Sequence, residues 1–359
     1  MDFTIDAEQK ALRDAVRTLA ERHAPQYGDG NAPVGPTDND EKTWSALAEL
    51  GALGLPFPEE DGGFGASPVE VGVVASELGR RGVRTAYADA LVANYVLTKA
   101  DSGSDVLEQA LSGEALVLPA LAEPGRAWSP LETDVTASGT GDEVKLTGTK
   151  GPVPSVATAT YVVVPASTDS GLGLFLAQVP EGSGPLVQLS DTPATLLVGP
   201  DRAADVLTEA LCLGIVALAG EALGAMEGAL QLTTEYLKTR KQFGVPLMTF
   251  QTLTQRAADM YAELELARST ALFAAMVIAE NPGDAVTASR TKVVVGQAGR
   301  RVGQEAIQLH GGIGMTAEYA VGHLAGRLAE IDRTFGDTRQ HLAALASGVS
   351  DHEMVDVLA

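Results

Sequence analysis

Apolar residues in the first hundred positions recur at the spacing of an α-helix. In the first such stretch, four of them share one helical face: Leu12, Ala15, Val16 and Leu19. Asp6 and Gln9 precede and open this stretch at the spacing of a capping box, so they predict where the helix begins. The helical period returns in three later segments: around Trp44, Leu47 and Leu50, over 68–80, and over 85–99. A Pro- and Gly-rich stretch over 23–40 predicts a mobile loop between the first two helices, and 53–65 predicts a sharp turn.

Between about Val117 and Val198 the helical period gives way to short segments of strand type. Three segments carry this signal: the alternating residues 143–147, the β-branched residues 161–164 and the apolar residues 174–176. Gly, Pro and Asp separate them, as in the turns of a compact sheet. This middle part predicts a β domain of roughly 80 residues.

From Asp201 onward the helical period continues to the end of the chain. A long apolar run rich in Gly and Ala, 210–237, predicts a buried helix. A later helix has an apolar face made of five residues: Val294, Ala298, Val302, Ala306 and Leu309. Helices, then strands, then helices predict an α+β fold, which we divide into domains at 1–112, 113–200 and 201–350.

Composition excludes several classes of protein. The net charge of −22 argues against nucleic acid and anionic membranes as partners, because both need a local surplus of basic residues. No uninterrupted apolar run reaches the roughly 18 residues of a membrane span, and the amino terminus lacks a signal-peptide pattern. Cys212, in an apolar run, is the single cysteine, so no internal disulfide forms and we expect a core position in a cytoplasmic protein. The five His are scattered, so we expect no metal site.

Residues 240–244 read Arg-Lys-Gln-Phe-Gly and follow the predicted buried helix directly, with Phe250 and Gln251 close behind. The guanidinium of Arg240 matches a pair of phosphate oxygens, the amide of Gln242 can bond a base or ribose, and the ring of Phe243 can stack. A solvated basic turn at the end of a surface helix would have the same composition. These residues alone leave both interpretations open.

A second glycine-rich segment favours the ligand interpretation. Residues 308–314 read Gln-Leu-His-Gly-Gly-Ile-Gly, and their glycines let backbone approach a ligand. His310 more plausibly packs at the end of the preceding helix than binds a metal. In this order, about 70 residues apart, the two segments resemble the Arg-x-Gln-Phe-Gly and Gln-x-x-Gly-Gly-x-Gly motifs of the acyl-CoA dehydrogenase family. Residues 58–63 also resemble the Pro-Glu-x-x-Gly-Gly element of that family.

The resemblance covers nearly the whole chain and implies a fold and a cofactor. It implies an amino-terminal helical domain, a middle β domain and a carboxy-terminal four-helix bundle. It also implies FAD, held at its pyrophosphate and adenosine end by Arg240, Gln242 and Phe243, while its flavin lies in the neighbouring subunit. Three more residues are expected on the adenine side: Gln308, Gly311 and Gly312.

Desaturation of an acyl-CoA needs a carboxylate that removes the α-proton and a flavin that accepts hydride. Members of the family carry the carboxylate in one of two places. One is the Glu of a Tyr-Glu-Gly-Thr-x-Gln segment, which matches 335–340 here; Thr338 and Gln340, which contact FAD in the family, are retained, but the Glu is replaced by Gly336. The other is a Glu on the first helix of the last domain, which aligns with Gly214.

Two other acids are candidates for the missing base. Asp337 is one residue from the first position, and Glu221 is two helical turns beyond Gly214, about 10 Å along the axis. Each has a structural alternative: Asp337 as a helix cap, and Glu221 as a helix-packing or partner-binding carboxylate.

The middle domain also departs from the family pattern. The family's Thr-Glu-Pro-x-x-Gly-Ser reads Ala-Glu-Pro-Gly-Arg-Ala-Trp at 122–128, so Trp128 replaces the Ser. The flavin-contacting Trp and Thr of a second motif are replaced by Pro152 and Pro154, which offer neither a backbone nor a side-chain donor. The losses fall on the flavin and base side of the site.

This pattern resembles the β-type subunit of actinobacterial α2β2 acyl-CoA dehydrogenases, including those that act on steroid side chains, which hold half the usual number of flavins. We expect a catalytic paralogue as partner, an acyl-CoA substrate and an electron-transfer flavoprotein as acceptor. Two alternatives stay open: a self-sufficient homotetramer with Asp337 or Glu221 as a displaced base, and a non-enzymatic scaffold or nucleotide-binding paralogue.

Overall fold

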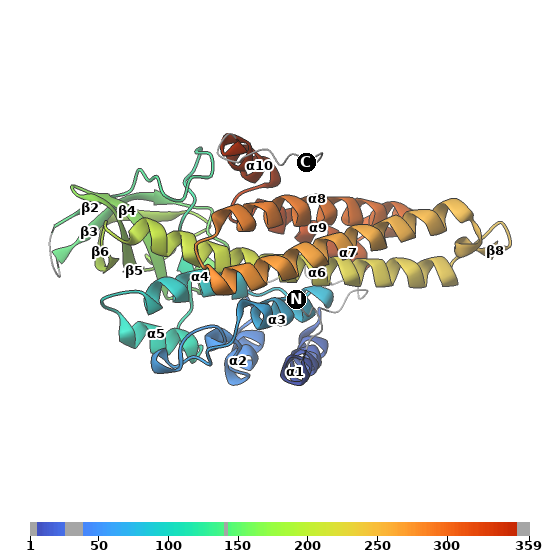
Figure 1. Ribbon diagram of the computed structural model, residues 1–359, viewed down its shortest axis with the longest axis horizontal. Helices are drawn as coiled ribbons and strands as arrows, with labels where there is room; N and C mark the ends of the chain where they lie inside the picture. Colours follow the sequence, from blue (N-terminus) through green and yellow to red (C-terminus); the bar gives the residue numbers. More distant parts are fainter. Residues whose placement is uncertain (1–5, 26–38, 140–142, 350–359) are drawn as a thin grey trace, which may run out of the picture.

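The computed structural model describes residues 6–25, 39–139 and 143–349 of the chain. Helices, strands and again helices follow one another in sequence, so the predicted α+β fold is confirmed. Figure 1 shows the strands at one end of the molecule and the small β7–β8 hairpin at the opposite end of two long helices, α6 and α7. The amino-terminal helices lie along one side of the long helices.

The amino-terminal part contains five helices among the described residues: α1 Ala7–His23, α2 Glu41–Glu49, α3 Pro68–Arg80, α4 Tyr87–Thr98 and α5 Ser104–Leu111. The capping box of Asp6 and Gln9 is confirmed, because Asp6 caps α1 and both reciprocal hydrogen bonds form. The sharp turn over 53–65 is made by two 3₁₀ turns, Ala52–Gly54 and Glu59–Asp61. Most of the predicted mobile loop, 26–38, lies outside the described residues. The sequence signals did not single out α5.

The middle part is a sheet of short strands: β1 Val117–Pro119, β2 Thr136–Ser138, β3 Lys145–Lys150, β4 Tyr161–Thr168, β5 Gly171–Gln178 and β6 Val187–Val198. The strand order is β1-β4-β2-β3-β6-β5, and a further pairing of β4 with β5 closes the sheet on itself. The three predicted strand segments lie in β3, β4 and β5 or overlap them. Val162 and Val164 of β4 are completely buried, as their β-branched character predicts.

The carboxy-terminal part begins with α6 Ala203–Thr239 and continues with α7 Gln251–Glu280, α8 Ala285–His310, α9 Ala320–Arg333 and α10 Thr338–Ser347. The first four pack as the expected bundle, while strands β7 Lys241–Gln242 and β8 Val245–Pro246 form the hairpin between α6 and α7. The buried helix expected over 210–237 is α6, and Cys212 is buried in it. Burial raises the pKa of the Cys212 thiol to about 12, so this side chain is inert core.

Helix α6 also packs against the amino-terminal helix α3 at unusually short range. A Cβ added at Gly224 would lie 1.9 Å from the carbonyl oxygen of Ser76, and one added at Gly220 would lie 2.6 Å from that of Gly72. Only glycine permits this approach, which explains the Gly- and Ala-rich composition of the run.

Among the described residues, α6 is also the one helix long and apolar enough to cross a membrane. Its most apolar window is 83% buried within the protein, as expected of a core helix.

The element type changes between Leu111 and Val117 and again between Val198 and Ala203. We therefore keep 1–112, 113–200 and 201–350 as the proposed domain division.

Candidate functional site

The first motif lies at the tip of the α6–α7 hairpin, on the surface. Arg240 is the carboxy-terminal cap of α6 and Gln242 lies in β7, both with exposed side chains. Phe243 has a backbone φ of 55° and is 91% exposed, with only an edge contact to Phe250 at 6.1 Å between ring centroids. The Arg240 guanidinium forms no ion pair with any residue that the structure describes. Such a set of unengaged donors and an exposed ring is suited to binding something outside the chain.

The second motif ends α8 and is also open to solvent. Gln308 is exposed, and Gly311 closes the helix with a φ of 65°. A Cβ added at Gly311 or Gly312 would meet no atom within 4 Å, so the space over this backbone is free. The glycines therefore allow close approach of a ligand, as the sequence predicted.

An aromatic cluster, which we define as Tyr236, His310 and Tyr319, brings the two motifs to the same end of the bundle. The His310 ring stacks on Tyr236 at 4.6 Å and lies 5.1 Å from Tyr319, ring centroid to ring centroid. Tyr236 is one turn before Arg240, and His310 directly precedes Gly311. His310 is buried, its Nδ1 lies 2.8 Å from the Ala306 carbonyl, and burial lowers its pKa. The prediction that His310 packs at the helix end is confirmed.

Thr338 and Gln340 lie far from this cluster, where α10 begins. Thr338 is buried, and both its backbone N–H and its hydroxyl donate to Asp332 Oδ1. Gln340 Oε1 accepts a 2.8 Å hydrogen bond from the Asp337 backbone N–H. The hydroxyl of Thr338 and the amide oxygen of Gln340 are thus engaged within the chain.

The two groups of predicted cofactor residues are widely separated. Gly214 of α6 packs against Phe335, next to α10, whereas Arg240 caps the other end of the same helix. Twenty-six residues of α-helix correspond to about 39 Å. One FAD cannot bridge this distance, so the two groups would belong to different cofactor sites.

Both positions that match the family's bases are closed by neighbouring side chains. A Cβ at Gly214 would lie 2.4 Å from Val92 Cγ2 and 2.9 Å from Phe335 Cε2. Gly336 has a φ of 90°, and its Cβ would lie 2.8 Å from Trp128 Cδ1. A glutamate fits at neither position without displacing these groups.

The two substitute acids are both held in structural interactions. Asp337 is the N-cap of α10 and accepts a 2.8 Å hydrogen bond from the Gln340 backbone N–H. Glu221 is 8% exposed and forms a two-point ion pair with Arg327, at 2.6 Å to Nε and 3.0 Å to Nη2. Although burial alone would lower the pKa of Arg327, the Glu221 carboxylate raises it above its usual range. Asp337 is thus a helix cap and Glu221 a helix-packing carboxylate, the structural alternatives given for them in the sequence analysis.

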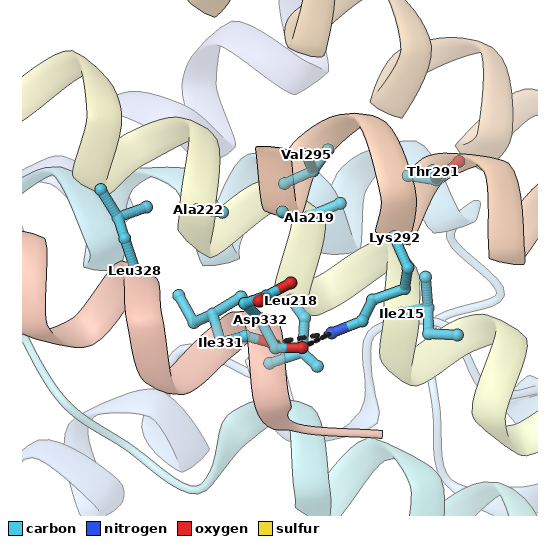
Figure 2. A pocket seen from close by; sticks show the side chains of 11 residues that line it. Ile215, Leu218, Ala219, Ala222, Thr291, Lys292, Val295, Leu328, Ile331 and Asp332 are labelled. Atoms are coloured by element: carbon cyan, nitrogen blue, oxygen red, sulfur yellow. Dashed lines mark hydrogen bonds between the residues drawn. The ribbon is translucent and has the colours of Figure 1, made fainter. Parts of the chain in front are cut away.

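A buried lysine, Lys292, holds the turn after α9, which carries Phe335 and the base position at Gly336. Figure 2 shows Lys292 of α8 pointing at the end of α9, where Nζ donates to the carbonyl oxygens of Ile331 at 2.7 Å and Asp332 at 3.1 Å. A third bond, 2.7 Å long, reaches the carbonyl of Thr334. Burial lowers the pKa of Lys292 to about 8. The lysine caps α9 and orients the following turn, which carries Phe335.

The middle domain contributes a buried ion pair instead of a flavin bed. Lys150 is fully buried, with Nζ 2.6 Å from Glu123 Oε1 and 2.9 Å from Thr133 Oγ1. Burial alone would raise the pKa of Glu123, but hydrogen bonds from Lys150 and Thr133 hold it below its ordinary value. Pro152 and Pro154 stand where the family motif has donors, and they have none to offer.

A cavity of about 970 Å³ opens between the middle domain and the end of α9. Its apolar wall includes Trp128 and Phe335, whose ring centroids are 6.3 Å apart, and its polar wall includes Arg327 and Arg333. Sequence reasoning did not find this cavity, because residues from segments far apart in the sequence line it. No group of three or more His, Cys, Asp or Glu that could hold a metal occurs in the described part of the chain.

FAD fits one end of the bundle and not the other. The hairpin tip offers the exposed side chains of Arg240, Gln242 and Phe243, and the backbone at Gly311 and Gly312 is open. This arrangement suits a pyrophosphate and an adenosine. At the cavity the proline wall has no N–H for a flavin ring, and Trp128 closes part of the space.

Comparison with known proteins identifies the class. Family models for the acyl-CoA dehydrogenase N-terminal and C-terminal domains match residues 6–111 and 204–347. The acyl-CoA dehydrogenase IpdE2 of Mycobacterium tuberculosis is 30% identical over 322 residues, which cover 88% of this chain and 89% of IpdE2. This chain therefore belongs to the acyl-CoA dehydrogenase family, whose cofactor is FAD.

Two solved structures of similar shape are heteromeric by their descriptions. A G363A variant of the Tcur3481–Tcur3483 steroid ACAD superimposes with a TM-score of 0.85 at 29% identity, covering 96% of this chain and 98% of that one. The ChsE4–ChsE5 complex from Mycobacterium tuberculosis gives 0.86 at 25% identity, covering 99% and 100%. The resemblance to heteromeric members of the family is thus supported.

Proposed function

We propose that this chain is the non-catalytic partner subunit of an acyl-CoA dehydrogenase, and that it completes the FAD site of a catalytic paralogue. The reaction is the α,β-desaturation of an acyl-CoA thioester, in which bound FAD accepts the hydride. In this proposal the paralogue supplies the base and the residues around the flavin ring, and this chain supplies the residues that bind the pyrophosphate and adenosine of FAD.

The proposal rests on a combination: both base positions are closed, while the cofactor motif at the hairpin tip is retained. Cβ atoms at Gly214 and Gly336 would overlap Val92 and Trp128, whereas the hairpin tip keeps its donors exposed. A chain that had lost all contact with FAD would have no reason to keep Arg240 and Phe243 exposed at a helix end. A complete enzyme would need a carboxylate that can reach the substrate.

Within the proposed site, the Arg240 guanidinium neutralises the pyrophosphate and Gln242 and Phe243 contact the adenosine. Gln308, Gly311 and Gly312 line the adenine side, where the absence of side chains lets the base lie on the backbone. Thr338 and Gln340 follow Phe335, which packs against Gly214 about 39 Å along α6 from Arg240, so in this chain we assign them to the start of α10.

The descriptions of two similar structures support a heteromer and a steroid substrate, since one is named a steroid ACAD and the other a complex of two different chains. We accordingly propose an α2β2 assembly in the cytoplasm, acting in steroid side-chain degradation. An electron-transfer flavoprotein is the proposed electron acceptor.

The self-sufficient alternative would need Asp337 or Glu221 as its base. Both carboxylates already have partners, the first in a capping box and the second in a two-point ion pair. Using Glu221 as a base would remove the two-point partner of the buried Arg327 guanidinium and leave its longer contact with Glu330, at 3.3 Å, which is unfavourable.

The decisive experiment is flavin stoichiometry. The protein is purified alone and after co-expression with candidate catalytic paralogues, and flavin absorbance is compared with protein concentration. Little flavin alone and about one per heterodimer would support the partner-subunit function. One flavin per chain without a partner would instead support the homotetramer, and a colourless protein with every paralogue would support a scaffold.

A further inference from the structure

The cavity between the middle domain and α9 is unused by the proposed function, and its size is that of a ligand site. Its volume of about 970 Å³ is at the upper end of the range for small-molecule pockets. Loops after β1 and β3 form one side, and the end of α9 with Arg84, which precedes α4, forms the other. Segments remote in sequence thus converge on one space.

One side of this cavity is apolar and cannot serve a flavin. This apolar wall includes Trp128, Pro152, Val153, Pro154 and Phe335. The Trp128 and Phe335 rings meet at 39°, so together they form a concave aromatic surface. Because the prolines donate no hydrogen bonds, this wall can hold a hydrocarbon body but not a heterocycle that needs donors.

The opposite side carries arginines, of which one is uncompensated. Arg84 and Arg327 share the Glu330 carboxylate, at 2.7 Å and 3.3 Å, and Arg327 is also held by Glu221. Arg333 is exposed and forms no ion pair with any residue in the described ranges. A guanidinium in this position binds a carboxylate through two hydrogen bonds at once.

The cavity offers little for catalysis. The carboxylates of Glu123, Glu132 and Glu330 on its wall all form ion pairs, the fourth carboxylate, Asp89, also has a partner within the chain, and the base position at Gly336 is closed by Trp128. A ligand here would be held and released unchanged.

We propose that this cavity binds an amphipathic organic carboxylate. The apolar body of the ligand lies against Trp128, Phe335 and the prolines, and its carboxylate pairs with Arg333 at the mouth. The proposal goes beyond the proposed function, because it concerns the end of the molecule that the shared FAD would not occupy.

The test uses the intrinsic fluorescence of Trp128. The chain has two tryptophans, and the other, Trp44, is buried among the amino-terminal helices. Decanoate is titrated into the protein at physiological salt, with decanol as the uncharged probe of the same chain length, and calorimetry measures the same affinities independently. We expect a saturable change in emission with decanoate that disappears in Trp128→Phe.

The charged contact is tested with Arg333→Gln against Arg290→Gln. Arg290 is also exposed but does not line the cavity, so both variants change the net charge equally. Arg333→Gln should weaken decanoate binding about 10- to 100-fold and leave decanol unchanged, whereas Arg290→Gln should leave both unchanged.

Three outcomes would overturn the proposal. They are no saturable binding of decanoate, equal affinities in the two arginine variants, or a decanoate signal that persists in Trp128→Phe. Titration with FAD separates this test from the proposed function: FAD binding that quenches Trp128 in the isolated chain would contradict both. Failure of decanoate alone would leave the partner-subunit function standing.

Discussion

The two ends of α6 have opposite characters. At the hairpin end, Arg240 and Phe243 are exposed and lack strong internal partners. At the cavity end, Thr338 bonds Asp332, and Gly214 and Gly336 are covered by other side chains. The cavity end is therefore closed by contacts within the chain, whereas the hairpin end exposes side chains that are available to a partner.

The difference separates residues that are available to bind a ligand from residues that are engaged within the chain. A polar group that binds a ligand is left unpaired in the free chain, because its partner comes from outside. Groups that have lost their ligand are stable only if they are buried and paired within the protein. By this criterion the hairpin end is available for a ligand and the cavity end is closed at both base positions, as the proposed function requires.

The largest effect is predicted for a substitution that breaks the buried ion pair between Lys150 and Glu123 at the cavity end. Lys150→Met removes the buried cation of Glu123 and leaves only the partly exposed Arg126, which should reduce the free energy of unfolding by about 3–5 kcal/mol. Urea unfolding measures the loss. The matched control is Arg126→Met, since Arg126 also lies 3.5 Å from Glu123 but is partly exposed; it should change stability much less than Lys150→Met. Equal effects of the two changes would mean that Lys150 is no structural element.

The next prediction tests whether the base can be restored. Gly336→Glu introduces a side chain at a φ of 90° and against Trp128, so it should destabilise the chain by about 1–3 kcal/mol and produce no dehydrogenase activity. The control, Gly326→Glu, lies on α9 where an added Cβ meets nothing within 4 Å, and should not destabilise. Activity and thermal unfolding are measured together. A stable, active Gly336→Glu protein would contradict the closure of the cavity end.

At the exposed hairpin end, a substitution should reduce FAD affinity and leave the stability of the chain nearly unchanged. Arg240→Ala should lower the FAD affinity of the complex with its paralogue about 10- to 100-fold, because a charged hydrogen bond to phosphate is lost. The stability of the isolated chain should change by less than about 0.5 kcal/mol, since Arg240 is exposed. Lys241→Ala removes the same charge one residue away and should have the smaller effect on FAD. Unchanged FAD occupancy in Arg240→Ala would count against the shared site.

Local signals account for the parts of the fold that the sequence predicted. The capping box of Asp6 and the proline that opens α3 mark helix starts within a few residues of sequence. Strand β6 was missed because its register is set by β3 and β5, and its own residues include Asp191 at a φ of 50°. Its strand conformation is imposed by partners that the local pattern does not contain.

The same division applies to the site. Exposed motif residues such as Arg240 and Gly311 could be predicted, because their role depends on the chain segment that carries them. The partner of Glu221 could not, since Arg327 is 106 residues away and no pattern links the two. The cavity was missed for that reason as well: its wall is assembled only when the middle domain packs against α9.

The smallest predicted effect lies between the two cofactor motifs, at His310. Burial lowers the pKa of His310 below its usual 6.5, so the unfolded chain binds this proton more readily than the folded chain. Stability from this group is therefore complete above pH 6.5 and is lost as the pH falls below that value, by at most about 1.4 kcal/mol per pH unit. His310→Phe keeps a ring against Tyr236 but cannot take up a proton, so its stability should fall less on acidification.

Urea unfolding of both proteins between pH 5 and 8 measures the difference. The curves should run parallel above pH 7, which is the internal control, and diverge below 6.5. Parallel curves over the whole range would mean that folding does not shift the pKa of His310. The packing of His310 on Tyr236 would then be insensitive to protonation, and acid would not loosen the hairpin end.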